Sequence, residues 1–100
     1  VAPDFMVSHN LVHKTAPAKP SGLQLRAARG LLGISAAELA RTAGVTWKTV
    51  QRFEAQTGIP PSRSGTLERV QAALEAQGIE FIGDPETSPG VILHRSPKDG

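Results

Sequence analysis

The chain has 100 residues, of which 39% are hydrophobic and 20% charged, with four aromatic residues and no cysteine. This composition is typical of one small globular domain, and it excludes a disulfide framework, a thiolate metal site and, since no apolar run reaches about eighteen residues, a transmembrane helix. We therefore expect a cytoplasmic protein with a single modest core.

The net charge of +2 is unevenly distributed along the chain. Between Arg26 and Arg63, six basic side chains stand against two acidic ones, which gives this part a charge of +4. Residues 64–100 carry three basic and six acidic side chains, which gives −3. A local positive field favours an anionic partner such as nucleic acid, and a merely well-solvated surface is the alternative.

Residues 1–20 show no sustained periodicity, hold three of the eight prolines and do not begin with methionine. We expect a flexible arm here, and favour plain disorder over an arm that binds DNA. If Met6 is the natural start, residues 1–5 are a remnant of cloning. His9 and His13 have the spacing of two metal ligands on a helix, but two ligands make an incomplete site, so no metal is expected.

A first helix is predicted to begin after Ser21, which can cap it, and to end at Gly33. Its apolar stripe is expected to be Leu23, Ala27, Leu31 and Leu32.

Two further short helices, joined by a tight turn, are predicted over Ser35 to Ala43 and Trp47 to Gln56. Ser35 and Glu38 have the spacing of a capping box. Gly44 suits the left-handed position that ends a helix, and Thr46 can cap the next one. The expected buried residues are Leu39, Ala40, Val45, Val50 and Phe53. Together these features outline a helix-turn-helix DNA reader.

After a loop over TGIPPSRSG, which cannot stay helical through two prolines, a fourth helix is predicted from Thr66 to about Gln77. Its apolar face is Leu67, Val70 and Leu74, and Gly78 ends it.

Two short apolar runs at residues 79–82 and 91–94, separated by the turn-rich GDPETSPG, predict a β-hairpin. Ile79 and Phe81 would share one face, with Ile82 on the other. We expect the hairpin to pack on the fourth helix, because an isolated hairpin is marginal. Its unpaired edge also makes it a candidate dimer contact.

Six residues fall in the register of the phage-repressor-like helix-turn-helix proteins, often called Xre-type regulators: Leu39, Ala40, Gly44, Val45, Val50 and Phe53. The chain resembles this family from Leu25 to Leu74, and its GIEFI and GVILHR segments are similar to a small bacterial subgroup with a C-terminal hairpin. The resemblance implies a mainly α fold: a four-helix repressor-like DNA-binding domain (21–78), a short β-hairpin (79–95) and a tail (96–100).

The resemblance also implies a structural ion pair between Arg29 and Glu54, which occupy the places of a basic residue and an acid that commonly pair in the family. A bidentate arginine suits a partly buried carboxylate. The chain departs from the family at Ala36, where a glutamine that touches a phosphate is common, so we expect that contact to be missing.

The outward arc of the predicted recognition helix is the candidate reading face. At 100° per residue, Trp47, Lys48, Gln51, Arg52 and Ala55 span about 140°, opposite Val50 and Phe53. Lys48 or Arg52 could donate to guanine and Gln51 could pair with adenine, whereas Trp47 either packs under the turn or contacts sugar and thymine methyl groups. The candidate phosphate contacts are Thr46, Thr49, Ser62, Arg63 and Ser64.

The sequence thus predicts sequence-specific binding of double-stranded DNA by a bacterial or phage-type transcriptional regulator, with repressor as the first expectation. Because one recognition helix reads few base pairs, we expect a homodimer. No nucleophile elbow, phosphate loop or catalytic cluster indicates an enzyme, and no cofactor, small-molecule ligand or membrane is implied. A protein-interaction module of the same fold, such as an antitoxin or a coregulator, stays open as the alternative.

Overall fold

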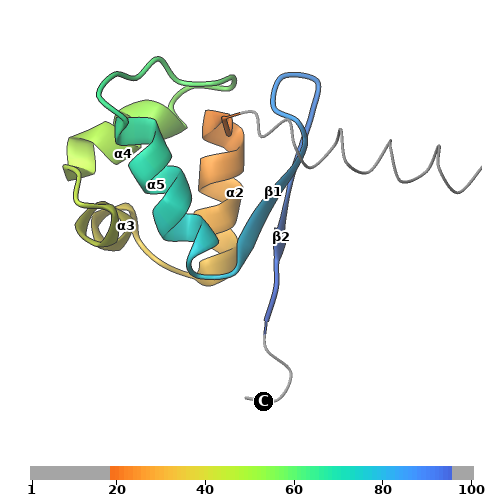
Figure 1. The fold of residues 1–100 in the computed structure, drawn as a ribbon, viewed down its shortest axis with the longest axis horizontal. Helices are drawn as coiled ribbons and strands as arrows, with labels where there is room; N and C mark the ends of the chain where they lie inside the picture. Colours follow the sequence, from red (N-terminus) through yellow and green to blue (C-terminus); the bar gives the residue numbers. More distant parts are fainter. Residues whose placement is uncertain (1–18, 96–100) are drawn as a thin grey trace, which may run out of the picture.

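The computed structural model describes residues 19–95, which form a small mixed α/β domain of four helices and one antiparallel hairpin (Figure 1). The helices are α2 (Gly22–Leu32), α3 (Ala36–Ala43), α4 (Trp47–Glu54) and α5 (Thr66–Glu75), and the strands are β1 (Ile79–Asp84) and β2 (Ser88–Leu93). The predicted order of elements is therefore confirmed. The expectations for residues 1–18, including His9 and His13, and for the tail lie outside the described residues.

The predicted capping residues and the glycine that ends α3 are confirmed around the tight turn. The Ser35 hydroxyl accepts from the Glu38 N–H and the Glu38 carboxylate accepts from the Ser35 N–H, both at 3.0 Å, which is the predicted capping box. Gly44 ends α3 with φ of 74°, a value that glycine adopts without strain. The Thr46 hydroxyl then accepts from the Thr49 N–H at 3.2 Å and begins α4.

The predicted apolar stripe of α2 is wrong in three of its four positions. Leu23 is 43% exposed and Leu31 49% exposed, and Ala27 is also at the surface. Leu25 and Ala28 lie in the core instead. Leu32 is the one residue of the expected stripe that packs against the core. This helix carries two apolar stripes, and packing against the remaining elements selects the one that includes Leu25.

The core lies between the helices and the inner face of the hairpin. Its fully buried large side chains include Phe53 of α4 and Leu67 of α5, as expected from the sequence. The buried hydrophobic residues are Leu25, Ala28, Leu39, Ala40, Ala43, Val50, Phe53, Leu67, Val70, Ala73, Leu74 and Ile79. Val45 is half-buried and packs on this cluster rather than lying within it.

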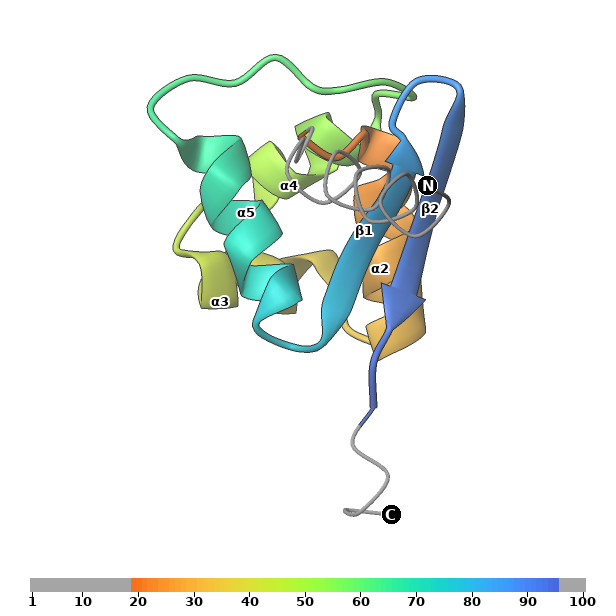
Figure 2. The same cartoon turned by 45° about the vertical axis from the view of Figure 1, so that its right-hand side comes forward.

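The hairpin strands are longer than predicted and pair in register from Ile79 with Leu93 to Asp84 with Ser88. Ile79 is buried and Phe81 packs on the core, so these two share the inner face as expected. The hairpin lies chiefly against α2, through β2, and β1 also contacts α5 (Figure 2). The expected packing of the hairpin on α5 is confirmed for β1, whereas its more extensive contact with α2 was not predicted.

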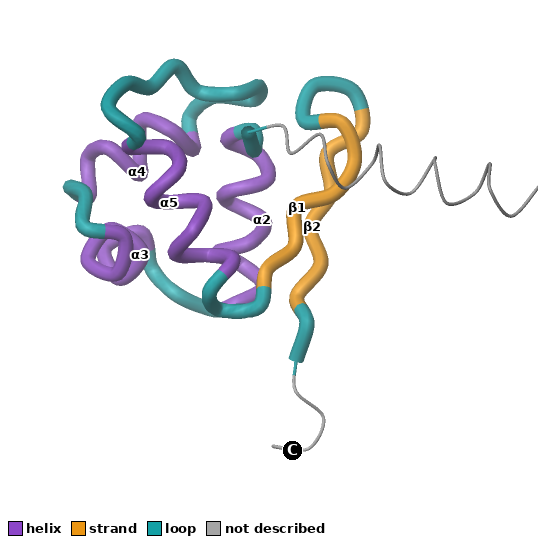
Figure 3. The backbone as a smooth tube through the Cα atoms, in the orientation of Figure 1, coloured by secondary structure: helices purple, strands orange, loops and turns teal. Residues whose placement is uncertain are grey.

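The loop between α4 and α5 runs along one end of the molecule, as the tube in Figure 3 shows. α4 ends at Glu54 and α5 at Glu75, each two residues before the predicted end. Within residues 19–95, no helix combines the length and apolar character that crossing a bilayer requires.

Candidate nucleic-acid interface

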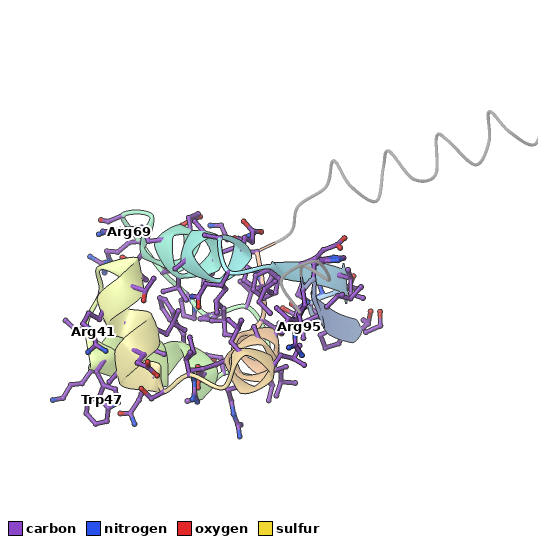
Figure 4. All side chains as sticks on the ribbon, turned by 90° about the horizontal axis from the view of Figure 1, so that it is seen from below. Arg41, Trp47, Arg69 and Arg95 are labelled. Atoms are coloured by element: carbon purple, nitrogen blue, oxygen red, sulfur yellow. The ribbon has the colours of Figure 1, made fainter. Side chains whose placement is uncertain are left out.

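The predicted reading face is the solvent-facing side of α4. Lys48, Gln51 and Arg52 are exposed, whereas Val50 and Phe53 on the opposite side are fully buried. Trp47 of α4 and Arg41 of α3 project at the same end of the molecule, and Arg95 lies at the other end, beside the hairpin (Figure 4). The exposed face of α4 is thus well separated from the hairpin.

Trp47 is a surface side chain, since it is 48% exposed. The side chain is therefore not buried in the core. At the first position of α4, just after the capping residue Thr46, the indole presents about half of its surface to solvent.

An ion pair between Arg29 and Glu54 connects α2 to α4. The Arg29 Nε and Nη2 atoms donate to the two oxygens of Glu54 at 2.9 and 2.8 Å, which is the bidentate geometry expected for these residues. Arg29 Nη1 also donates to the Ile34 carbonyl at 3.1 Å. The hydrogen bond to Glu54 raises the pKa of Arg29, although partial burial opposes the shift.

Arg52 lies over the ring of Phe53, with its guanidinium carbon 5.5 Å from the ring centroid. This distance is within the range of a cation–π interaction. The interaction restrains the arginine side chain without removing its charge, and its guanidinium forms no ion pair with any residue between 19 and 95.

The two threonines predicted to contact phosphate lie together at the start of α4. Their hydroxyl oxygens are 2.9 Å apart, and Thr46 also accepts from the Thr49 N–H. Thr46 is exposed and Thr49 half-buried. The Thr46 hydroxyl caps α4 and the Thr49 hydroxyl is hydrogen-bonded to it, so the structure brings this pair together at the start of α4.

Ser62, Arg63 and Ser64, the other predicted phosphate contacts, lie in the loop before α5. The Ser62 hydroxyl accepts from the Leu67 N–H at 3.0 Å and so caps α5, whose Gly65 N-cap has no side chain to do so. Arg63 and Ser64 are exposed, and Ser64 has a positive φ of 60°. The sequence did not predict this capping role of Ser62, because the Leu67 N–H from which its hydroxyl accepts lies five residues later in the chain.

One feature beside the reading face was not predicted. A surface depression of about 240 Å³ is lined by residues from α2, α3 and α4: Arg26, Arg29, Ala36, Gln51, Glu54 and Ala55. No local sequence pattern could have found it, because it depends on how α2, α3 and α4 lie relative to one another. Gln51 belongs to both the depression and the reading face.

Among residues 19–95, no three His, Asp or Glu side chains gather in the way a metal ion requires. The sequence was also compared with protein-family models and with curated proteins, and neither comparison gave a match.

Proposed function

We propose that the chain binds double-stranded DNA by inserting α4 into the major groove, and that it acts as a helix-turn-helix transcriptional regulator of the repressor kind. The observation that carries this proposal is the exposed face of α4. Lys48 and Arg52 are both exposed there, and neither forms an ion pair within the described part of the chain. Cations left unpaired on a rigid helix are available to an anionic partner.

The chemistry of this face suits base edges. Arg52 and Lys48 can donate to the O6 and N7 atoms of guanine, and Gln51 can both donate to and accept from adenine. Each good bidentate pair discriminates by about 1–3 kcal/mol against the wrong base. The Arg29–Glu54 pair supports this function indirectly, because it ties α4 to α2 and limits its movement.

Two copies on a near-palindromic site complete the proposal, since a single recognition helix reads few base pairs. The exposed leucines of α2, Leu23 and Leu31, and the exposed Ile92 of β2 supply apolar surface for contact between copies. Stoichiometry on a selected operator duplex tests this part. Two protomers bound cooperatively are expected, and one protomer at saturation would contradict the dimer.

The reading face is tested by selecting bound duplexes from a random pool and measuring affinity by fluorescence anisotropy. The double variant K48A/R52A should lose sequence-specific binding while its melting temperature falls by no more than about 5 °C, because both side chains are exposed and only the Arg52–Phe53 contact is lost. R95A is the matched control for each single variant, K48A and R52A, because each also loses one positive charge and Arg95 lies at the other end of the molecule (Figure 4).

Two results would contradict the proposal. If the wild type enriches no sequence and its weak binding is insensitive to salt, the protein does not read DNA, because phosphate neutralisation makes real binding steeply salt-dependent. If the wild type binds but K48A/R52A binds equally well, DNA is read by another surface.

A further inference from the structure

The outer strand of the hairpin, β2, has one edge without a hydrogen-bonding partner in the part of the chain that the structure describes. In Figure 2, β1 lies between α5 and β2, so β2 is at the margin of the sheet. The His94 N–H donates to the Gly78 carbonyl at 2.8 Å, next to the pair of Ile79 and Leu93. Because hydrogen-bonded and non-hydrogen-bonded pairs alternate in an antiparallel ladder, the N–H and C=O groups of Val91 and Leu93 point away from β1. These four groups bond to no other backbone group within residues 19–95.

The edge of β2 is protected against pairing at only one of its ends. Natural edge strands are commonly protected by charged side chains, by proline or by a bulge. Residues 88–93 include no charged side chain, and β2 pairs with β1 residue for residue, without a bulge. Pro89 has no N–H and so blocks the first part of the edge. The remaining part, from Val91 to Leu93, is open to a further strand.

An exposed apolar stripe of α2 lies on the same side of the molecule as this edge. Gln24 faces the hairpin, because its side-chain amide donates to carbonyls of both strands. At 100° per residue, Leu31 lies about 20° from Gln24 around the helix, on the side away from Leu25 and the core. Ala27 and Leu23 continue the stripe on that side, and all three residues are exposed. Since β1 contacts α5 and β2 contacts α2, the side away from the core is the side of β2.

A second copy of the chain fits this surface, because β2 can pair with itself. We consider two β2 strands that run antiparallel about a two-fold axis at Ile92. The free N–H and C=O groups of Val91 then meet those of Leu93 in the other copy, so all four groups of each strand gain a partner. Ile92, which is 39% exposed, lies opposite Ile92 of the other copy. The absence of charge on β2 means that two copies do not repel each other at this edge.

The contact is small, and its size determines how it is used. A stable interface takes about 20–30 residues from each partner. β2 has six residues and the stripe of α2 adds three, so the dimer is weak in solution. A duplex that holds two copies side by side raises their effective concentration and completes the contact. DNA and the second copy can be bound together, because the exposed face of α4 is well separated from the hairpin (Figure 4).

We infer that two copies of the chain join through the open edges of β2, with Ile92 at the two-fold axis, and form one four-stranded sheet. The inference rests on the proposed function, which calls for two copies on one operator, and it identifies the surface through which they meet. The α2 stripes of both copies lie beside this joined sheet and are covered with it. Since the sheet fixes the two recognition helices relative to each other, the operator should have one fixed half-site spacing.

A single cysteine at the two-fold axis tests the contact. The chain contains no cysteine, so I92C carries one thiol. Opposed residues of a non-hydrogen-bonded antiparallel pair have Cα atoms about 4.5 Å apart, which suits a disulfide. The matched control is I59C, because Ile59 is 37% exposed and lies in the loop between α4 and α5. With oxidised glutathione, the covalent dimer of I92C should form at least about tenfold faster, since paired strands hold the thiols at a high effective concentration. Equal rates would overturn the inference.

A charge exchange at the same position tests the register. I92K and I92E each place two like charges directly opposite each other, which destabilises a cross-strand pair. Each variant alone should sediment as a monomer at concentrations where the wild type dimerises, whereas an equimolar mixture should form the heterodimer. Circular dichroism of both should match the wild type, because the side chain points outward. A wild type that stays monomeric at every concentration, or a mixture that does not associate, would contradict the shared sheet.

Failure of this inference can be told apart from failure of the proposed function. Selective cross-linking of I92C, with no binding of any duplex by the wild type, would support the shared sheet and overturn the proposed function. Cooperative binding of two wild-type copies to a selected duplex, with I92C no faster to cross-link than I59C, would overturn the shared sheet alone. In that case the copies meet through another surface.

Discussion

Gln24 of α2 and Ile82 of β1 are joined by a hydrogen bond of 3.0 Å, although 58 residues separate them in the chain. The same Nε2 atom donates to the Gly90 carbonyl of β2 at 2.8 Å, and the side-chain oxygen accepts from the Ser21 N–H at 2.9 Å. Gln24 is 3% exposed. One buried amide therefore completes the cap of α2 and attaches both strands of the hairpin to it.

The replacement Q24E should destabilise the protein strongly. A carboxylate of the same shape has no hydrogens to donate, so it would face the carbonyl oxygens of Ile82 and Gly90 without solvent. We expect the free energy of unfolding to fall by about 3 kcal/mol, the range for a buried group left without its partners. Urea denaturation measures this loss, and hydrogen exchange of the β1 and β2 amides shows whether the hairpin detaches.

The exposed Gln56 provides a matched control for this substitution. Q56E introduces the same charge at the surface and should change stability by less than about 0.5 kcal/mol. Equal effects of Q24E and Q56E, or unchanged exchange rates in the hairpin of Q24E, would show that the Gln24 amide does not hold the hairpin.

Replacement by alanine should lower the stability of the protein at one glycine of α2 and raise it at another. A Cβ atom on Gly22 would lie 2.1 Å from the Gln56 carbonyl oxygen and 2.3 Å from that of Phe53, so G22A must displace the end of α4. We expect a loss of about 1–3 kcal/mol, the usual cost of overpacking. A Cβ on Gly30 meets nothing within 4 Å, and G30A should stabilise the helix by about 0.5–1 kcal/mol.

Thermal unfolding of the two variants, monitored by circular dichroism, checks this pair. Because both substitutions add one methyl group to the same helix, helix propensity alone would raise the melting temperature of both. A G22A variant that is as stable as G30A would mean that α2 and the end of α4 do not approach as closely as the structure shows.

The parts of the fold that could be predicted from sequence depend on neighbours a few residues away. The capping box of Ser35 and Glu38 and the glycine stop at Gly44 are of this kind. The inner face of α2 could not be predicted, because Leu23 and Leu25 begin two equally regular apolar stripes. Only contacts with distant elements, such as the bonds from Gln24 to the hairpin, decide which stripe is buried.

The candidate site also has one part that could be predicted from the sequence and one part that could not. The exposed arc of α4 follows from helical periodicity once Val50 and Phe53 are known to be buried, so Lys48 and Arg52 could be placed outside from the sequence. The depression could not, since it needs the relative positions of α2, α3 and α4. Arg26 lies 25 residues before Gln51 in the chain, and no local pattern relates them.

The ion pair between Arg29 and Glu54 should show strong coupling in a double-mutant cycle. Either R29M or E54M alone leaves a charged, partly buried group without its partner, and each should cost about 1.5–3 kcal/mol. The double variant R29M/E54M should recover much of this loss, because methionine fills similar space without charge. Urea denaturation of the four proteins gives the coupling energy, and simple additivity of the two single effects would contradict a direct interaction.

The β1–β2 turn should lose stability in acid through Asp84. Its Oδ1 atom accepts from the Glu86 N–H at 2.8 Å and the Thr87 N–H at 3.0 Å, and these two hydrogen bonds lower the pKa of Asp84 below the ordinary value of an aspartate. Because the folded pKa is the lower one, the stabilisation is present above the ordinary value, about pH 4, and is lost as the pH falls through the folded pKa. NMR titration of the carboxyl carbon measures that pKa directly, while the Glu86 and Thr87 amide shifts follow the turn. D84N should abolish the acid transition of these amides, and an Asp84 that titrates at or above the ordinary value would contradict the hydrogen-bonded turn.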